Sequence, residues 1–138
     1  MRGNVIKVFE KDDDDKKLFQ FPDYLAVSPD LSTIYISDFN NDTLTLLTQE
    51  GRVLDVVKDN YNIYDPRNVT VDSAGRVYVC GQSFNAVSRL SPETGTVTAL
   101  LGGQDVSWPR CVATSDRTGC LYVGMGDSKL IEIFENPK

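Results

Sequence analysis

One unit of about 43 residues recurs along this chain, and no other feature limits the fold as strongly. Each copy begins with a proline followed by an apolar strand, at Pro22, Pro66 and Pro109. A second strand with alternating apolar residues follows in every copy. The tyrosines at the equivalent position of this second strand are Tyr35, Tyr78 and Tyr122. A fixed period of this length predicts a repeat architecture rather than a fold with one continuous core.

Each unit is predicted to consist of short β-strands. The segments alternate with a period of two, are rich in β-branched and aromatic residues, and are separated by turns that contain Gly or Asp. The second strands are predicted at 33–36, 76–79 and 120–123, the third at 43–47, 86–90 and 129–133, and the fourth at 53–57 and 97–101. No segment shows a sustained apolar stripe with a period of 3.6 residues, which excludes a helical solenoid.

Four antiparallel strands per unit are typical of a β-propeller blade, which buries its faces only against neighbouring blades. We therefore predict an all-β fold, a partial β-propeller equal to about half of a six-bladed ring. Residues 1–138 form this single partial propeller. Residues 22–58 and 66–103 are the two full blades, residues 109–136 are three strands of a third blade, and residues 4–21, through strands at 4–9 and 17–21, are the last two strands of a preceding blade.

Composition narrows the classes of function. Fourteen basic and twenty acidic residues give a net charge of −6, which repels nucleic acid and anionic membranes. The chain has no histidine, the commonest general base and metal ligand, and its three cysteines lack CxxC spacing. No apolar run approaches the roughly 18 residues of a membrane span, and the N-terminus lacks a secretory signal. We predict a cytoplasmic protein without cofactor or metal.

The first full unit resembles an NHL repeat. Its residues read Pro22-Asp-Tyr-Leu-Ala-Val-Ser, then Ile34-Tyr-Ile-Ser-Asp38, followed by Asn, an apolar strand and Gly51. The second and third units depart from the NHL pattern, because Gly81 and Met125 stand where Asp38 does. The chain is most similar to the C-terminal propellers of invertebrate tripartite-motif (TRIM-NHL) proteins, and WD-repeat propellers are less similar.

This resemblance implies a protein-interaction scaffold that recognises a substrate or partner for a ubiquitin-ligase-type protein. Ligase chemistry would lie elsewhere, so the chain itself is expected not to be an enzyme. A protein partner is expected, whereas nucleic acid and membrane are not.

Loops at one end of the propeller are the expected contact surface. Strand alternation places the loops before each first strand and those between second and third strands at the same end. These loops are rich in aromatic, Met and Arg residues, a mixture enriched in binding hot spots. The candidate partner-binding residues are Tyr24, Asp38, Phe39, Tyr61, Tyr64, Arg67, Phe84, Trp108, Arg110 and Met125. Packing between adjacent blades is the alternative explanation for any single aromatic residue among them.

The alternative function is a fragment of a six-bladed propeller enzyme of the metal-dependent gluconolactonase type. Such sites gather carboxylate and amide ligands where the innermost strands begin. This chain offers Asp23, Asn68 and Cys111 there, which is a poor ligand set without histidine.

Two further expectations concern the ends of the repeat array. Asp12, Asp13, Asp14 and Asp15 are read as a solvated acidic turn between two strands. Terminal blades would expose apolar faces and an unpaired strand edge, so the chain is expected to self-associate through its open blade faces or to aggregate.

Overall fold

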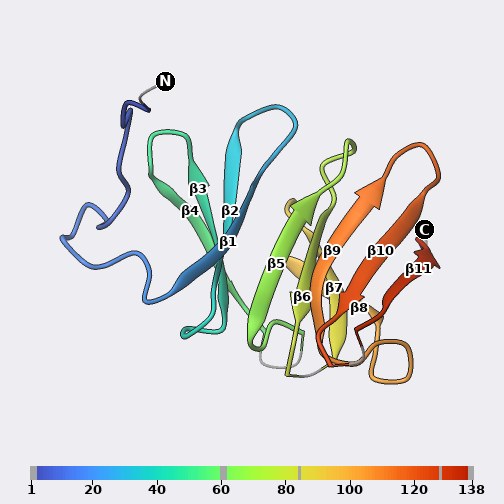
Figure 1. Ribbon diagram of the computed structural model, residues 1–138. Helices are drawn as coiled ribbons and strands as arrows, with labels where there is room; N and C mark the ends of the chain where they lie inside the picture. Colours follow the sequence, from blue (N-terminus) through green and yellow to red (C-terminus); the bar gives the residue numbers. More distant parts are fainter. Residues whose placement is uncertain (1–2, 60–61, 84, 128, 137–138) are drawn as a thin grey trace.

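Three antiparallel sheets stand side by side like the blades of a fan (Figure 1). The computed structural model describes residues 3–59, 62–83, 85–127 and 129–136. The first sheet contains β1 (Pro22–Val27), β2 (Thr33–Asp38), β3 (Thr43–Thr48) and β4 (Val53–Lys58); the second contains β5 (Pro66–Val71), β6 (Val77–Gly81), β7 (Ala86–Ser91) and β8 (Thr96–Leu101); the third contains β9 (Pro109–Ser115), β10 (Cys120–Met125) and β11 (Ile131–Glu135). The predicted all-β partial propeller is confirmed. Within the described part of the chain, no helix has the length and apolarity that crossing a membrane requires.

Consecutive strands pair within each sheet, so that β1, β5 and β9 are the first strands of three successive blades. The repeat tyrosine pairs with equivalent residues of the third strand in the first two blades, since Tyr35 pairs with Leu46 and Tyr78 pairs with Arg89. Tight turns join the strands. Gly51, in the turn between β3 and β4, has a φ of 91°, a conformation that costs glycine little.

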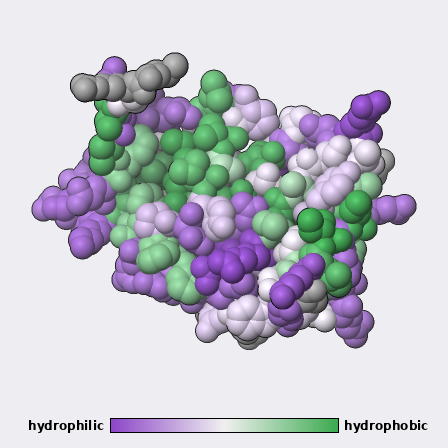
Figure 2. Space-filling view, viewed as in Figure 1, coloured by the Kyte–Doolittle hydropathy of each residue, from purple (hydrophilic) through white to green (hydrophobic). Residues whose placement is uncertain are grey.

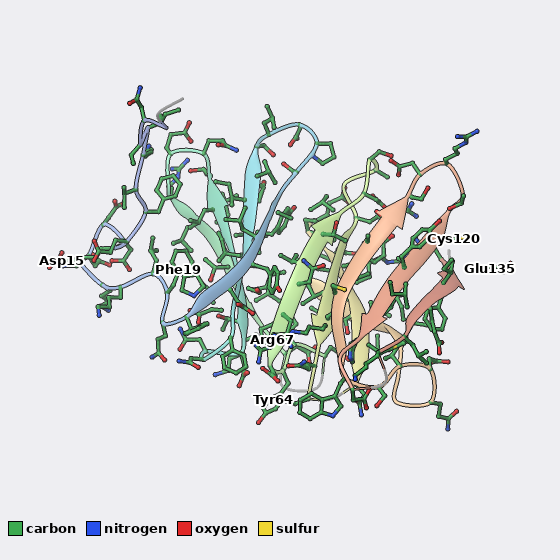
Figure 3. All side chains as sticks on the ribbon, viewed as in Figure 1. Asp15, Phe19, Tyr64, Arg67, Cys120 and Glu135 are labelled. Carbon is green, nitrogen blue, oxygen red and sulfur yellow. The ribbon has the colours of Figure 1, made fainter. Side chains whose placement is uncertain are left out.

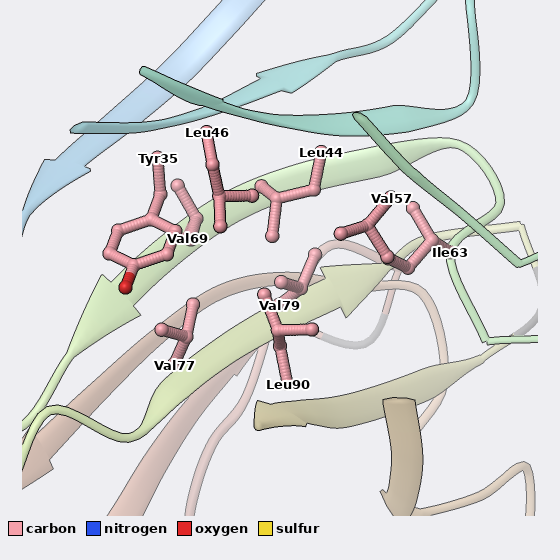
Figure 4. Close-up of a cluster of buried hydrophobic side chains, with 9 residues drawn as sticks. All are labelled: Tyr35, Leu44, Leu46, Val57, Ile63, Val69, Val77, Val79 and Leu90. Atoms are coloured by element: carbon pink, nitrogen blue, oxygen red, sulfur yellow. The ribbon is translucent and has the colours of Figure 1, made fainter. Parts of the chain in front are cut away.

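The apolar core lies between blades rather than inside one sheet. One face of the first sheet packs on the opposite face of the second, and Figure 4 shows the buried side chains at this interface. This first cluster contains Tyr35, Leu44, Leu46, Val57, Ile63, Val69, Val77, Val79 and Leu90. A second cluster joins the second sheet to the third through Tyr78, Cys80, Val87 and Val112, among other residues. Each blade is therefore stabilised by its neighbour.

Residues 3–21 do not form the two strands that were predicted at 4–9 and 17–21. The only ladder contact in this described segment is a bridge between Lys11 and Lys17, which closes a short hairpin around the acidic turn. Asp12 caps this turn, because its Oδ1 accepts bonds from the backbone N–H of Asp14 and Lys16 at 2.9 Å each. Residues 4–9 form no strand in the structure. The solvated acidic turn is as expected.

The turn between β1 and β2 holds a carboxylate that titrates at low pH. The Asp30 Oδ1 accepts bonds from the Ser28 and Ser32 hydroxyls at 2.7 Å each and from the Ser32 N–H at 3.0 Å. The hydroxyl of Ser28 is the largest cause, and together these bonds lower the pKa of Asp30 from 3.8 to about 2.

We expect Ser28→Ala to raise the pKa of Asp30 toward its ordinary value, because a donor to the charged form is lost. The carboxyl carbon of Asp30 can be followed by NMR during acid titration. The bonded carboxylate stabilises the fold above pH 3.8, and this contribution disappears as the pH falls to about 2. A midpoint near 3.8 in the unmodified chain would contradict this assignment.

Candidate functional site

Loops of all three blades meet at the end of the sheets where the first strands begin, which we call the proline end. It comprises the loops that precede Pro22, Pro66 and Pro109 and the loops that join second to third strands, at the lower edge of Figure 1. The opposite end carries the turns β1–β2, β5–β6 and β9–β10. Among the described residues, the proline end gathers Arg, Trp and Gln side chains from adjacent blades around one hollow.

The same kind of hydrogen bond fixes the loops before Pro66 and Pro109. The N–H of Asp65 donates to the Oδ1 of Asp42 at 2.9 Å, and the N–H of Trp108 donates to the Oδ1 of Asn85 at 2.7 Å. All four residues have positive φ values between 50° and 53°, which Asp and Asn tolerate better than other residues. Each second-to-third loop therefore holds the start of the next blade.

The first blade uses a buried carboxylate for the same purpose. Asp38 ends β2, and its Oδ1 and Oδ2 accept bonds from the N–H of Phe21 at 2.9 Å and of Gln20 at 2.8 Å. The Asn41 Nδ2 donates to the same Oδ2 at 2.9 Å. Asp38 is completely buried, so its role in this structure is to anchor the chain as it enters β1.

Arg67 lies at the centre of the proline end, between the first and second blades (Figure 3). Its Nη1 is 3.3 Å from the Oδ2 of Asp23, and its Nε donates to the Oε1 of Gln82 at 3.0 Å. The Oδ1 of Asp65 is 3.5 Å from the same Nε. The guanidinium also stacks on the Phe39 ring, 3.9 Å from its centroid. These contacts hold a cation in one position while its side chain stays one-fifth exposed.

Beside Arg67 is an open hollow of about 460 Å³ between the second and third blades. Its lining consists of Arg67, Gln82, Trp108, Arg110, Gly126 and Asp127. Arg67 and Arg110 are the second residues of β5 and β9, so they occupy equivalent positions in adjacent blades. Arg110 is exposed and takes part in no ion pair among the described residues. The hollow therefore places two guanidinium groups and the Asp127 carboxylate beside an indole ring.

The three candidate metal ligands do not fit a metal site. The Asp23 carboxylate faces Arg67, and the Asn68 Oδ1 accepts a bond from the N–H of Val112 at 2.9 Å. The Cys111 Sγ lies against Gly124. The described residues contain no group of three or more His, Cys, Asp or Glu side chains that could hold an ion. The fixed guanidinium of Arg67 supplies the positive charge at the proline end.

The candidate residues predicted from the sequence are distributed unevenly. Arg67, Trp108 and Arg110 line the hollow together. Phe39 supports Arg67, while Tyr24 and Tyr64 are exposed on the surface. Asp38 and Met125 are buried, and Met125 belongs to the core between the second and third blades. Tyr61 and Phe84 lie outside the described residues.

Sequence reasoning missed Gln82, Asp127 and the pair formed by Asp42 and Asn85. Asp42 and Asn85 are 43 residues apart, at the same place in the repeat. That recurrence of a short polar side chain was the signal that could have identified the bond to the next blade. Gln82 has no such signal, because its role depends on Arg67 approaching it from the neighbouring strand.

No protein-family model matches this chain, and no curated protein matches it. Solved structures do. Hydrazine synthase from Kuenenia stuttgartiensis is 21% identical, with a TM-score of 0.73 over 96% of this chain and 36% of that one. Virginiamycin B lyase from Staphylococcus aureus is 17% identical, with a TM-score of 0.62 over 85% and 42%. A gluconolactonase from Xanthomonas campestris is 16% identical, with a TM-score of 0.65 over 88% and 40%.

These matches establish the propeller fold, and the chain spans less than half the length of each of the three structures. They also correct two predictions. A non-catalytic scaffold for a ubiquitin ligase was expected, and the chain was expected not to be an enzyme. Both predictions are wrong, because the similar propellers are named as a synthase, a lyase and a gluconolactonase. Aromatic and Arg residues in the loops suit a small-molecule site as well as a protein interface.

Proposed function

We propose that this chain is part of a propeller enzyme of the gluconolactonase type, and that the hollow beside Arg67 and Arg110 holds a small substrate with a lactone or carboxylate group. The observation that carries the proposal is the pair of guanidinium groups at equivalent positions of adjacent blades, lining one hollow. The gluconolactonase among the similar structures supports the same class.

Charge at the hollow favours an anion or a group that becomes one. Guanidinium groups bind carboxylates through paired, charge-assisted hydrogen bonds. Arg67 is already oriented by Asp23, Asp65 and Gln82, so binding does not require it to lose much further freedom. Arg110, which is exposed, supplies the second set of donors. Trp108 is half exposed beside them and offers a flat face to a ring.

The same groups suit the opening of a lactone. When water adds to the lactone carbonyl, negative charge develops on the carbonyl oxygen, and a fixed guanidinium stabilises it. Asp127 lines the hollow, with its Oδ2 accepting a bond from the Ser107 hydroxyl at 2.6 Å. This carboxylate would accept the proton from the attacking water and return it to the ring oxygen as the acyl C–O bond breaks, which gives a hydroxy-carboxylic acid. No step requires a metal held by the described residues.

We expect Arg110→Ala to weaken the binding of gluconate, a hydroxy-carboxylate, by about 10- to 100-fold, because each charge-assisted hydrogen bond contributes about 1.5–3 kcal/mol. Isothermal titration calorimetry measures the binding, and acid release from gluconolactone measures turnover. Arg117→Ala is the matched control, since Arg117 is exposed at the opposite end of β9. EDTA should leave gluconate binding unchanged. Equal effects of the two substitutions, or loss of binding in EDTA, would refute the proposal.

We also propose that the blades are of the NHL type. Its support is the first unit, where the Asp of the pattern, Asp38, holds the chain before Pro22. Gly81 and Met125 replace that Asp in blades whose preceding loop is held by Asp42 and Asn85 instead. The loss of the Asp is thus matched by a different acceptor.

A further inference from the structure

Both end blades present a face that is buried in the middle of the chain. Strand register identifies equivalent residues, because Leu46, Arg89 and Ile133 all lie opposite the repeat tyrosine. Two residues before them, Leu44 and Val87 are fully buried against the next blade. The third member of this set, Ile131, is 77% exposed. The third blade therefore has the face that packs on a following blade, and that face is open.

The first blade is open on the opposite side. Val69 of β5 and Val112 of β9 are 3% and 5% exposed, because a preceding blade covers them. Their equivalent in β1 is Leu25, three residues after its proline, and Leu25 is 63% exposed. Figure 2 shows apolar surface at both ends of the molecule. These two open faces correspond to the two sides of the interface that already joins the blades within the chain.

Among the described residues the third sheet has three strands, and a segment that matches a fourth strand lies near the start of the chain. A glycine, one further residue and a valine occur at the start of both fourth strands. They are Gly51-Arg-Val53, where β4 begins at Val53, and Gly95-Thr-Val97, where β8 begins at Thr96. Gly3-Asn-Val5 repeats this pattern, and the residues that follow, Ile-Lys-Val-Phe9, match Leu-Asp-Val-Val57. This segment lies on the side of the first sheet that faces away from the second (Figure 1), where Phe9 packs against Gly51.

The register of the complete blades shows how the segment would pair with β11. Leu44 pairs with Val57 in the first blade, and Val87 pairs with Leu101 in the second. In the third blade, the equivalent pair would be Ile131 with Phe9. Leu47 pairs with Val53, and Leu90 pairs with Val97. The equivalent pair in the third blade would be Phe134 with Val5.

In the register of the second blade Lys7 falls directly opposite Glu132, whereas in that of the first blade it falls opposite Ile133, so the pair defines the second-blade register. Apolar pairs at both ends and an opposite-charge pair between them stabilise such a ladder.

We propose that two copies of this chain close a six-bladed ring, in which residues 5–10 of each copy form the fourth strand on β11 of the other. The Leu25 face of one copy covers the Ile131 face of the other, as Val69 and Leu44 meet within the chain. Two copies of this chain contribute about six blades, which lies within the four to eight blades of propellers. Closure leaves every blade with four strands and removes the exposed edge of β11.

A charge exchange tests this contact. Within one chain, Lys7 lies in the segment beside the first sheet and Glu132 lies in β11 of the third sheet. A second copy would therefore be needed to bring them together. Light scattering across a dilution series of the 138-residue chain should give a species of twice 15.3 kDa. Lys7→Glu and Glu132→Lys should each raise the dimer Kd by about 10-fold or more, since every dimer contains the contact twice. The double exchange should restore the Kd to within about 3-fold. Glu93→Lys, a matched exposed reversal, should leave it unchanged.

A second measurement does not depend on these charges. In a background with Cys111→Ser and Cys120→Ser, Val5→Cys copies are mixed with Phe134→Cys copies under a mild oxidant. Disulfide-linked heterodimers should form, while each variant alone should stay unlinked. A monomer at every concentration would overturn the proposal. So would a dimer in which the two charge reversals add without mutual rescue and the mixed cysteine copies stay unlinked.

Discussion

Asp38→Ala is expected to lower the free energy of unfolding by about 3–5 kcal/mol. The carboxylate is fully buried and accepts three hydrogen bonds, two of them from the N–H groups of Gln20 and Phe21. Removing it leaves those donors without a partner at the place where the chain enters β1. Urea denaturation followed by circular dichroism measures the change.

Two comparisons isolate the cause. Asp38→Asn keeps one acceptor oxygen and should be less destabilising than Asp38→Ala. Asp13→Ala removes an exposed carboxylate from the acidic turn and should change stability by less than about 0.5 kcal/mol. If Asp38→Ala and Asp13→Ala are equally mild, the anchoring role assigned to Asp38 is wrong.

The repeat made the architecture predictable because each strand is specified locally. Alternation about Tyr35, Tyr78 and Tyr122 places one face of every second strand against a neighbouring blade, and the structure has these strands where the pattern predicts them. Residues 4–9 carry an equally good strand pattern but form none. A strand needs an edge to pair with, and that requirement is not visible in the pattern of one segment.

The site was predictable only for residues beside the prolines that begin the first strands. Arg67, Trp108 and Arg110 have this position and line the hollow. Met125 was predicted to lie in the loop between a second and a third strand, but it ends β10, pairs with Pro109 and is buried. The network around Arg67 was not predictable, since Asp23 approaches it from β1 and Gln82 from the turn after β6.

Function was misjudged for a related reason. Net charge and loop composition describe the whole surface, whereas the paired guanidinium groups of Arg67 and Arg110 depend on the rotation between adjacent blades. The net charge of −6 argues against nucleic acid as a partner but does not describe how charged side chains are arranged around the hollow, where Arg67 and Arg110 lie in equivalent positions. The expected protein partner at the proline end and the cytoplasmic location stay predictions from the sequence.

Leu44→Ala is expected to cost about 2–5 kcal/mol of unfolding free energy, because a fully buried Leu leaves a cavity between two blades that relax only partly. The repeat supplies a matched control. Ile131 occupies the same register position in the third blade but is exposed, so Ile131→Ala should change the stability of the isolated chain by less than about 0.5 kcal/mol at dilutions where it is monomeric.

Chemical denaturation of both variants at one protein concentration gives the comparison. At concentrations where copies associate, Ile131→Ala should raise the dimer Kd while Leu44→Ala acts mainly on folding. The two substitutions remove apolar groups from equivalent positions, one inside the chain and one at its open face. Equal losses of unfolding free energy in the monomer would mean that the third blade is already covered, and that the blades pack differently from the arrangement described.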